Sequence, residues 1–84
     1  MSCDRSASLC LRVTAEHDPG ALARVLERFQ NLNVFPRKVS CELASTGEVH
    51  IRVDVSGLSE EMLSLITGKV AQVPCILNAY WHYL

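Results

Sequence analysis

Residues Glu16, His17, Asp18, Pro19 and Gly20 have the composition of a loop that could hold a small ligand. Gly20 has no side chain, so a ligand could approach its backbone closely. A helix that starts here directs free N–H groups and the positive end of its dipole at the loop, which favours a bound carboxylate. The same residues are also good helix starters, with Asp18 as N-cap and Pro19 at the first helical position. The loop therefore has both a binding and a purely structural interpretation.

The other side chains that could do chemistry are scattered along the chain. His50 and His82 are among the alternating polar residues of two predicted strands, so they could share one face of the sheet. Two histidines alone, however, are weak evidence for a metal site. Glu60 and Glu61 are adjacent on a predicted helix and do not face each other, so we interpret them as charges of its first turn. The sequence has no nucleophile turn and no glycine-rich phosphate loop. We expect a non-catalytic protein without a metal or a cofactor.

The four cysteines are widely spaced and never form a C-x-x-C pair. The chain has no apolar run of the length of a signal peptide or a membrane span, so we expect a cytoplasmic protein with reduced thiols. Cys10, Cys41 and Cys75 lie in apolar, strand-like runs, where a free cysteine behaves as a small hydrophobic residue. Cys3 belongs to a small, polar stretch, residues 1–7, which we expect to be a disordered tail.

Length and charge restrict the classes of function. The chain has 84 residues and a net charge of −1, which predicts one domain over residues 8–84. The near-zero charge argues against nucleic acid and against an electrostatically bound membrane as partners. Hydrophobic residues make up 49 % of the chain and charged residues only 20 %. Such an apolar excess in a small chain is typical of a protein that associates with other chains.

The hydropathy pattern predicts six elements. Period-2 alternation indicates strands, and apolar residues at helical spacing indicate helices. The first helical stripe contains Ala21, Leu22, Val25, Leu26, Phe29 and Leu32, and the second contains Met62, Leu65, Ile66 and Val70. The predicted strands cover residues 8–15, 34–43, 48–56 and 75–84, and the predicted helices cover residues 20–32 and about 59–70.

This β-α-β-β-α-β order predicts an α+β fold of the ferredoxin-like class. Right-handed crossovers then give a four-stranded antiparallel sheet with both helices on one face. The first and third strands are central in that topology, and the second and fourth are edges. Pro36 agrees with an edge position for the second strand, because proline cannot donate to a hydrogen-bond ladder.

The run L-R-V-T-A-E-H-D-P-G-A-L-A-R-V-L-E-R-F resembles the opening of an ACT domain, with Pro19, Gly20 and Leu22 at matching positions. The resemblance covers about residues 8–83 and implies a dimeric regulatory module. Such a module binds an amino acid between this loop and a strand of the partner. Within the class, the chain is most similar to the short, single-domain small subunit of acetolactate synthase. The supporting residues are Pro19, Leu22, Arg24, Val25, Leu26, Val39, Ile51, Val53, Lys69, Val70, Val73 and Ile76.

The resemblance implies partners and site residues. Small subunits of this kind stimulate a large, thiamine-diphosphate-dependent catalytic subunit, and related members confer feedback inhibition by valine. The implied effector-binding residues are His17, Asp18, Pro19, Gly20, Ala21 and Phe35. His17 and Phe35 stand where valine-sensing members carry asparagines. A stand-alone protein-interaction module without an effector is therefore the alternative.

Two surfaces are candidates for contact with another chain. Residues 34–43, with the flank of the first helix, form the expected homodimer seam, because edge strands carry unpaired backbone groups. The aromatic stretch from Tyr80 to Leu84 is the second candidate. In the other interpretation of that stretch, Trp81 and Tyr83 cap the core and leave Tyr80 and His82 outside.

Overall fold

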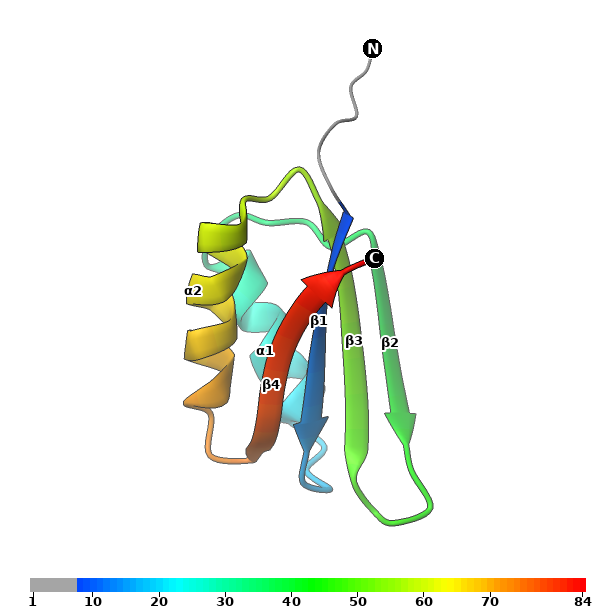
Figure 1. Ribbon diagram of the computed structural model, residues 1–84. Coiled ribbons are helices and arrows are strands. Elements are labelled where there is room, and N and C mark those ends of the chain that lie inside the picture. The colour runs from blue at the N-terminus through cyan, green and yellow to red at the C-terminus, as the bar shows by residue number, and fades with distance from the viewer. Residues whose placement is uncertain (1–7) are drawn as a thin grey trace.

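The computed structural model describes residues 8–84, so the predicted tail and Cys3 lie outside the described residues. All six predicted elements are present in the predicted order (Figure 1). The strands are β1 (Ser8–Ala15), β2 (Lys38–Leu43), β3 (Val49–Ser56) and β4 (Ile76–Tyr83), and the helices are α1 (Ala21–Gln30) and α2 (Glu60–Ala71).

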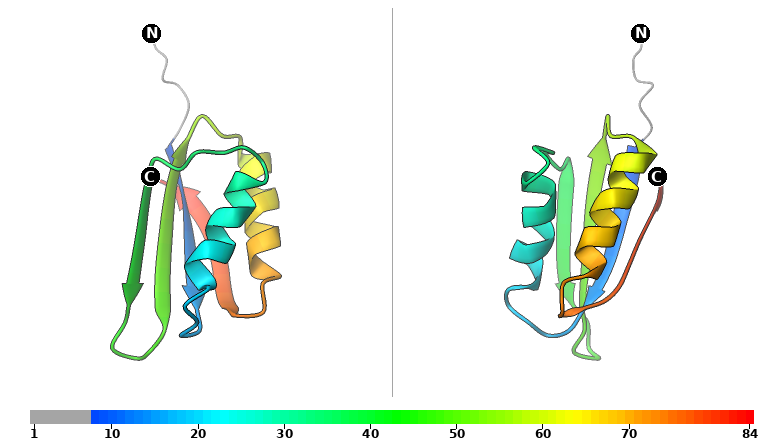
Figure 2. Two further views of the ribbon diagram at one scale, coloured as in Figure 1. Left: turned by 180° about the vertical axis from the view of Figure 1, so that it is seen from behind. Right: turned by 90° about the vertical axis from the view of Figure 1, so that its left-hand side faces the viewer.

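The sheet is antiparallel throughout, with the strand order β2-β3-β1-β4. Both helices cover the same face, and the other face is open (Figure 2). The predicted ferredoxin-like fold is confirmed, including the central positions of β1 and β3 and the edge positions of β2 and β4.

The core lies between the helices and one face of the two central strands. β1 and β3 each direct every second side chain toward the helices, as their alternating sequences predict. Ala21, Val25 and Phe29 of α1 are fully buried against them. The buried strand residues are Leu9, Leu11, Val13, Ala15, Val49, Ile51, Val53 and Val55.

The buried stripe of α2 differs from the predicted one. Leu63, Ile66 and Val70 are fully buried, whereas Leu65 is 48 % exposed and Met62 only partly buried. Residues 63, 66 and 70 follow the i, i+3, i+7 spacing of one helical face, and Leu65 lies about 100° around the helix from Ile66. Both leucines fit a helical pattern, so only the rotation of α2 about its axis on the sheet decides which of them is buried.

The predicted second strand begins too early. β2 starts at Lys38, not at residue 34. Asn33 adopts a left-handed φ of 60° just after α1, as its residue type permits, and the chain then crosses to the sheet edge. Pro36 lies in this crossing segment, and the strand pairing starts after it.

Cys41 is exposed, contrary to the prediction that it is a buried small hydrophobic residue. Its pairing with Ile51 places it on the helix-covered face, but all six residues of β2 are exposed because the helices do not extend over this strand. Cys10 and Cys75 are buried as predicted.

Local capping fixes the start of α2. The Oγ of Ser59 accepts a hydrogen bond from the Met62 backbone N–H at 3.1 Å, which confirms the predicted N-cap. Glu60 and Glu61 follow in the first turn, where negative charge interacts favourably with the helix dipole. Neither helix of residues 8–84 is long and apolar enough to cross a bilayer.

Replacing the two neighbouring leucines of α2 tests this rotation. We expect Leu63→Ala to lower the free energy of unfolding by about 2–5 kcal/mol, because it opens a cavity in the core. The matched change Leu65→Ala should cost less than about 1 kcal/mol, since that side chain is largely in water. Urea denaturation of both variants measures the difference, and equal losses would contradict the observed rotation.

Candidate functional site

The loop between β1 and α1 is closed by its own aspartate. The Oδ1 atom of Asp18 accepts a hydrogen bond from the Gly20 N–H at 2.8 Å, and the Asp18 carbonyl accepts one from the Ala21 N–H at 3.0 Å. Gly20 is therefore the N-cap residue and Ala21 the first residue of α1. The prediction that Asp18 is the N-cap and Pro19 the first helical residue is wrong by two positions, because the Asp18 turn forms before the helix begins.

The same turn fills the space beside the Gly20 backbone, where we predicted that a ligand could come close. A Cβ atom at Gly20 would lie 3.3 Å from Asp18 Oδ1, so the nearest group is the carboxylate of the chain itself. By helix geometry, the N–H groups of Leu22 and Ala23 have no acceptor within α1 and remain for a ligand. Arg24 lies beside them, with its Nη1 3.5 Å from Asp18 Oδ2 in an exposed ion pair. His17 and Pro19 are exposed at the rim of the loop.

Phe35 lies at the opposite end of the fold from this loop. The loop precedes α1 and Phe35 follows it, so the ten-residue helix, about 15 Å long, separates them. Figure 2 shows the two connections at opposite ends of the cyan helix. Of the predicted effector residues, a single chain thus brings together His17, Asp18, Pro19, Gly20 and Ala21, but not Phe35.

The surface around Phe35 is apolar and uncovered. The Phe35 side chain is 92 % exposed, and Val39 and Leu43 follow on the helix-facing side of β2 at 38 % and 57 %. Beside them lies a groove of about 570 Å³, which is lined by Leu26, Gln30, Asn33, Val34, Phe35, Pro36, Arg37, Lys38 and Val39. The left panel of Figure 2 shows β2 projecting beyond α1. We call this surface, formed by β2, residues 33–37 and the flank of α1, the β2 surface.

The open face of the sheet carries a polar network that sequence reasoning missed. Arg52 Nε lies 2.9 Å from Asp54 Oδ1, and Arg52 Nη2 lies 3.3 Å from Asp54 Oδ2. Between β1 and β4, Arg12 Nε donates to His82 Nε2 at 3.1 Å. The alternation of the sequence already predicted that these residues lie on the polar face of their strands. Which residues are neighbours depends on the strand register, which a single sequence does not specify.

Asp54 is a buried carboxylate whose charge is compensated. Burial alone would raise the pKa of Asp54, but hydrogen bonds from Arg52 and Cys10, together with the positive charges of Arg52 and Lys38, outweigh it. The pKa of Asp54 is consequently lowered, and the group remains ionised at neutral pH.

Cys10 lies between Asp54 and His82 in the strand register, which brings a thiol, an imidazole and a carboxylate together. The thiol is fully buried, however, and burial, followed by the hydrogen bond to Asp54 and its negative charge, raises the pKa of Cys10. Both ring nitrogens of His82 are already engaged, Nε2 by Arg12 and Nδ1 by the Tyr83 carbonyl. A buried thiol with a raised pKa is a poor nucleophile, so this arrangement is structural.

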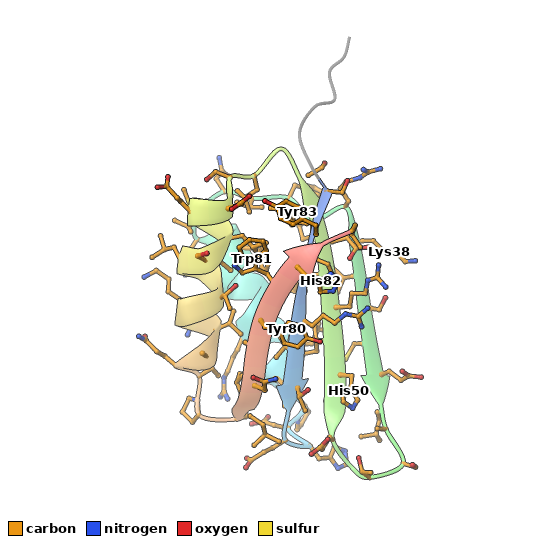
Figure 3. All side chains as sticks on the ribbon, in the orientation of Figure 1. Lys38, His50, Tyr80, Trp81, His82 and Tyr83 are labelled. Atoms are coloured by element: carbon orange, nitrogen blue, oxygen red, sulfur yellow. The ribbon has the colours of Figure 1, made fainter. Side chains whose placement is uncertain are left out.

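His50 and His82 both lie on the open face, as predicted (Figure 3). They do not form a pair, because His50 is the register partner of Thr14 and His82 that of Cys10, four residues away along β1. The nearest acidic group to His50 is Glu48, at 4.0 Å. Over residues 8–84, no three His, Cys, Asp or Glu side chains lie together as metal ligands would.

The aromatic C-terminal strand divides between core and surface. Trp81 packs against the core, and its Nε1–H donates to Ser64 Oγ of α2 at 3.0 Å. Tyr83 meets Trp81 edge-on, with ring centroids 5.7 Å apart, but half of it is exposed. The capping interpretation thus describes Trp81 and fails for Tyr83.

The fold has well-matched structural neighbours. No family model matches the chain, and no curated protein is similar to it in sequence. The C-terminal domain of the MgtC protein from Mycobacterium tuberculosis superposes with a TM-score of 0.78 at 11 % identity, over 100 % of this chain and 94 % of that one. The ACT domain of GTP pyrophosphokinase from Chlorobium tepidum gives 0.76 at 12 % identity, over 92 % and 99 %.

A third neighbour belongs to a much longer chain. A homoserine dehydrogenase from Thiobacillus denitrificans matches with a TM-score of 0.74 and 15 % identity, over 94 % of this chain and 17 % of that one. Identities this low show the fold alone. The protein therefore has an ACT-like, ferredoxin-like fold.

The ion pair of Asp54 predicts a specific loss of stability in acid. Because the folded-state pKa lies below the ordinary value of 3.8, the stabilising contribution is complete above 3.8 and is lost as the pH falls through the folded-state pKa. Between about pH 5 and pH 2.5, the free energy of unfolding should fall less in Asp54→Asn than in the wild type. Glu27→Gln, which removes an exposed carboxylate on α1, should retain the wild-type pH dependence. Parallel curves for Asp54→Asn and the wild type would contradict the assignment.

Proposed function

We propose that the protein is a non-catalytic regulatory module that forms a homodimer through the β2 surface and binds an amino acid in the seam. The observation that carries the proposal is the β2 surface itself, an edge strand with unpaired backbone groups beside exposed apolar side chains. In a chain this small, a second copy is the simplest way to cover such a surface.

A twofold pairing of β2 with β2 would extend the sheet from four strands to eight. Because the pairing is antiparallel, the partner is reversed end for end. The partner's Phe35 then lies toward the end of the fold that carries the β1–α1 loop. This arrangement would unite all six predicted effector residues, His17 to Ala21 from one copy and Phe35 from the other.

The chemistry of the loop fits a zwitterionic ligand. The free N–H groups of Leu22 and Ala23 and the guanidinium of Arg24 are suited to an amino-acid carboxylate. The exposed ring of Phe35 from the second copy would contact an apolar side chain of the ligand. Asp18 already occupies the Gly20 amide, so a ligand has to bind beside this turn.

We infer that the module acts in the cytoplasm on a larger enzyme of amino-acid metabolism, with the catalytic subunit of acetolactate synthase as the first candidate. The sequence resemblance supports this partner. The same fold within GTP pyrophosphokinase and homoserine dehydrogenase shows that such domains occur in large enzymes. The self-closed Asp18 turn favours the alternative, a stand-alone protein-interaction module without an effector.

A charge placed on the β2 surface tests the dimer. We expect the wild type to be a dimer in sedimentation-velocity experiments and Val39→Lys to be a monomer with an unchanged circular-dichroism spectrum, because edge lysines oppose strand pairing. Leu65→Lys, an equivalent change at an exposed leucine of α2, should leave the dimer intact. A monomeric wild type, or dissociation of both variants, would contradict the proposed seam.

Calorimetric titration with the standard amino acids tests the effector site. We expect at least one apolar amino acid to bind, and Phe35→Ala to weaken binding about tenfold while the dimer persists. Leu77→Ala, on the other edge strand, is the control and should bind like the wild type. If no amino acid binds to a confirmed dimer, the interaction module without an effector replaces the regulatory one. Co-purification of a large synthase subunit would separately test the proposed partner.

A further inference from the structure

The open face of the sheet has two arginines side by side at its centre. Arg12 of β1 and Arg52 of β3 are direct register partners, with Ser40 beyond Arg52 and Tyr80 beyond Arg12. We call these four residues the arginine row. Like charges directly opposite in an antiparallel pair are destabilising unless other groups compensate them. The row itself contains no acidic residue.

Only one of the two arginines is neutralised by the protein. Asp54 engages Arg52 with both carboxylate oxygens, at 2.9 Å and 3.3 Å. Within residues 8–84, Arg12 has no carboxylate partner. Its single side-chain hydrogen bond goes to His82 Nε2.

The histidine in that contact is the acceptor. A guanidinium Nε–H can only donate, so His82 Nε2 has to accept. The proton of the ring then lies on Nδ1, which is 2.7 Å from the Tyr83 carbonyl oxygen and donates to it. His82 thus orients Arg12 without compensating its charge, and the terminal amino groups of Arg12 remain available.

A hollow of about 500 Å³ lies along the arginine row. Its polar lining is rich in donors, since Thr14, Ser40, Asn78 and Tyr80 surround the two arginines. The one acidic lining residue is Glu42, which lies in the next row, opposite His50. Figure 3 shows Tyr80 between His82 and His50 on this face. The hollow is much larger than an inorganic ion needs, and the Tyr80 ring at its side is half exposed.

We propose that this hollow binds a small phosphate monoester, with the phosphate at Arg12 and Arg52 and the organic part against Tyr80. A phosphate dianion presents three acceptor oxygens to paired guanidinium groups and neighbouring hydroxyls, whereas a carboxylate presents two and carries half the charge. The site lies on the face of the sheet away from the helices. It is therefore on the other side of the sheet from the site proposed for the amino acid, although Ser40 belongs to β2, the strand of the proposed seam.

Titration monitored by amide chemical shifts of the ¹⁵N-labelled protein tests the proposal with three probes: phenyl phosphate, inorganic phosphate and benzoate. We expect saturable shifts at residues of β1, β3 and β4 around the arginine row. Phenyl phosphate should bind more tightly than inorganic phosphate, because only the ester has a ring to contact Tyr80. Benzoate, with the same ring and a single charge, should bind at least tenfold more weakly than phenyl phosphate.

Variants separate the roles of the two contacts. Arg12→Gln should weaken the binding of phenyl phosphate about tenfold or more. Lys69→Gln, an equal loss of charge at an exposed lysine of α2, should not change the affinity. Tyr80→Leu should weaken the binding of phenyl phosphate but leave the affinity for inorganic phosphate unchanged. Because Tyr80 is half exposed and Arg12 lies outside the apolar core, the variants should fold, which unperturbed shifts of distant amides would verify.

Four results would overturn the proposal. They are the absence of saturable shifts with either phosphate, equal affinity for benzoate and phenyl phosphate, wild-type affinity in Arg12→Gln, or an equal loss in Lys69→Gln. A fifth such result would be shifts at the arginine row that depend on protein concentration without any probe, because they would assign the open face to a second copy of the chain.

Discussion

Two helices can cover only one face of a four-stranded sheet, and this constraint governs the rest of the molecule. The strands direct their alternate side chains to the two faces, so each strand needs an apolar and a polar series. The apolar series of β1 and β3 meets α1 and α2 and forms the sheet side of the core. The other series remains in contact with water and can carry charge, which is where the Arg52–Asp54 and Arg12–His82 contacts lie.

The two edge strands also differ in whether a helix covers them. α2 packs along β4, with Trp81 bridging the two through its hydrogen bond to Ser64. β2 has no helix over it and is exposed along its whole length, although its alternation is as regular as that of the buried strands. An apolar series without a cover is unfavourable in water, and this strand with the segment before it exposes Phe35, Val39 and Leu43.

The six elements and their topology could be predicted from the sequence because periodicity and breakers are local properties. Alternation in residues 8–15 and 48–56, and the Ser59 cap, are examples of patterns that hold whatever the surroundings are. The errors in burial concern properties that depend on the surroundings of a residue. Leu65 and Leu63 fit a helical pattern equally well. Cys41 has the alternation typical of a buried strand residue, but no helix covers its strand.

The candidate sites were harder to predict for the same reason. The β1–α1 loop could be identified from its residue types, but not that Asp18 would satisfy the Gly20 amide itself. The arginine row could not be found at all, since its members come from four strands and become neighbours only through the register.

The pairing of β1 with β4 has a mechanical consequence. The Leu84 N–H donates to the Ser8 carbonyl at 2.9 Å, so the chain enters and leaves the fold at the same end. A force that pulled residues 8 and 84 apart would act across the strands instead of along them. It would open the β1–β4 ladder one hydrogen-bonded pair at a time, in the manner of a zipper. Tension between these two points would thus release β4 first, while β1, β3 and β2 could remain paired.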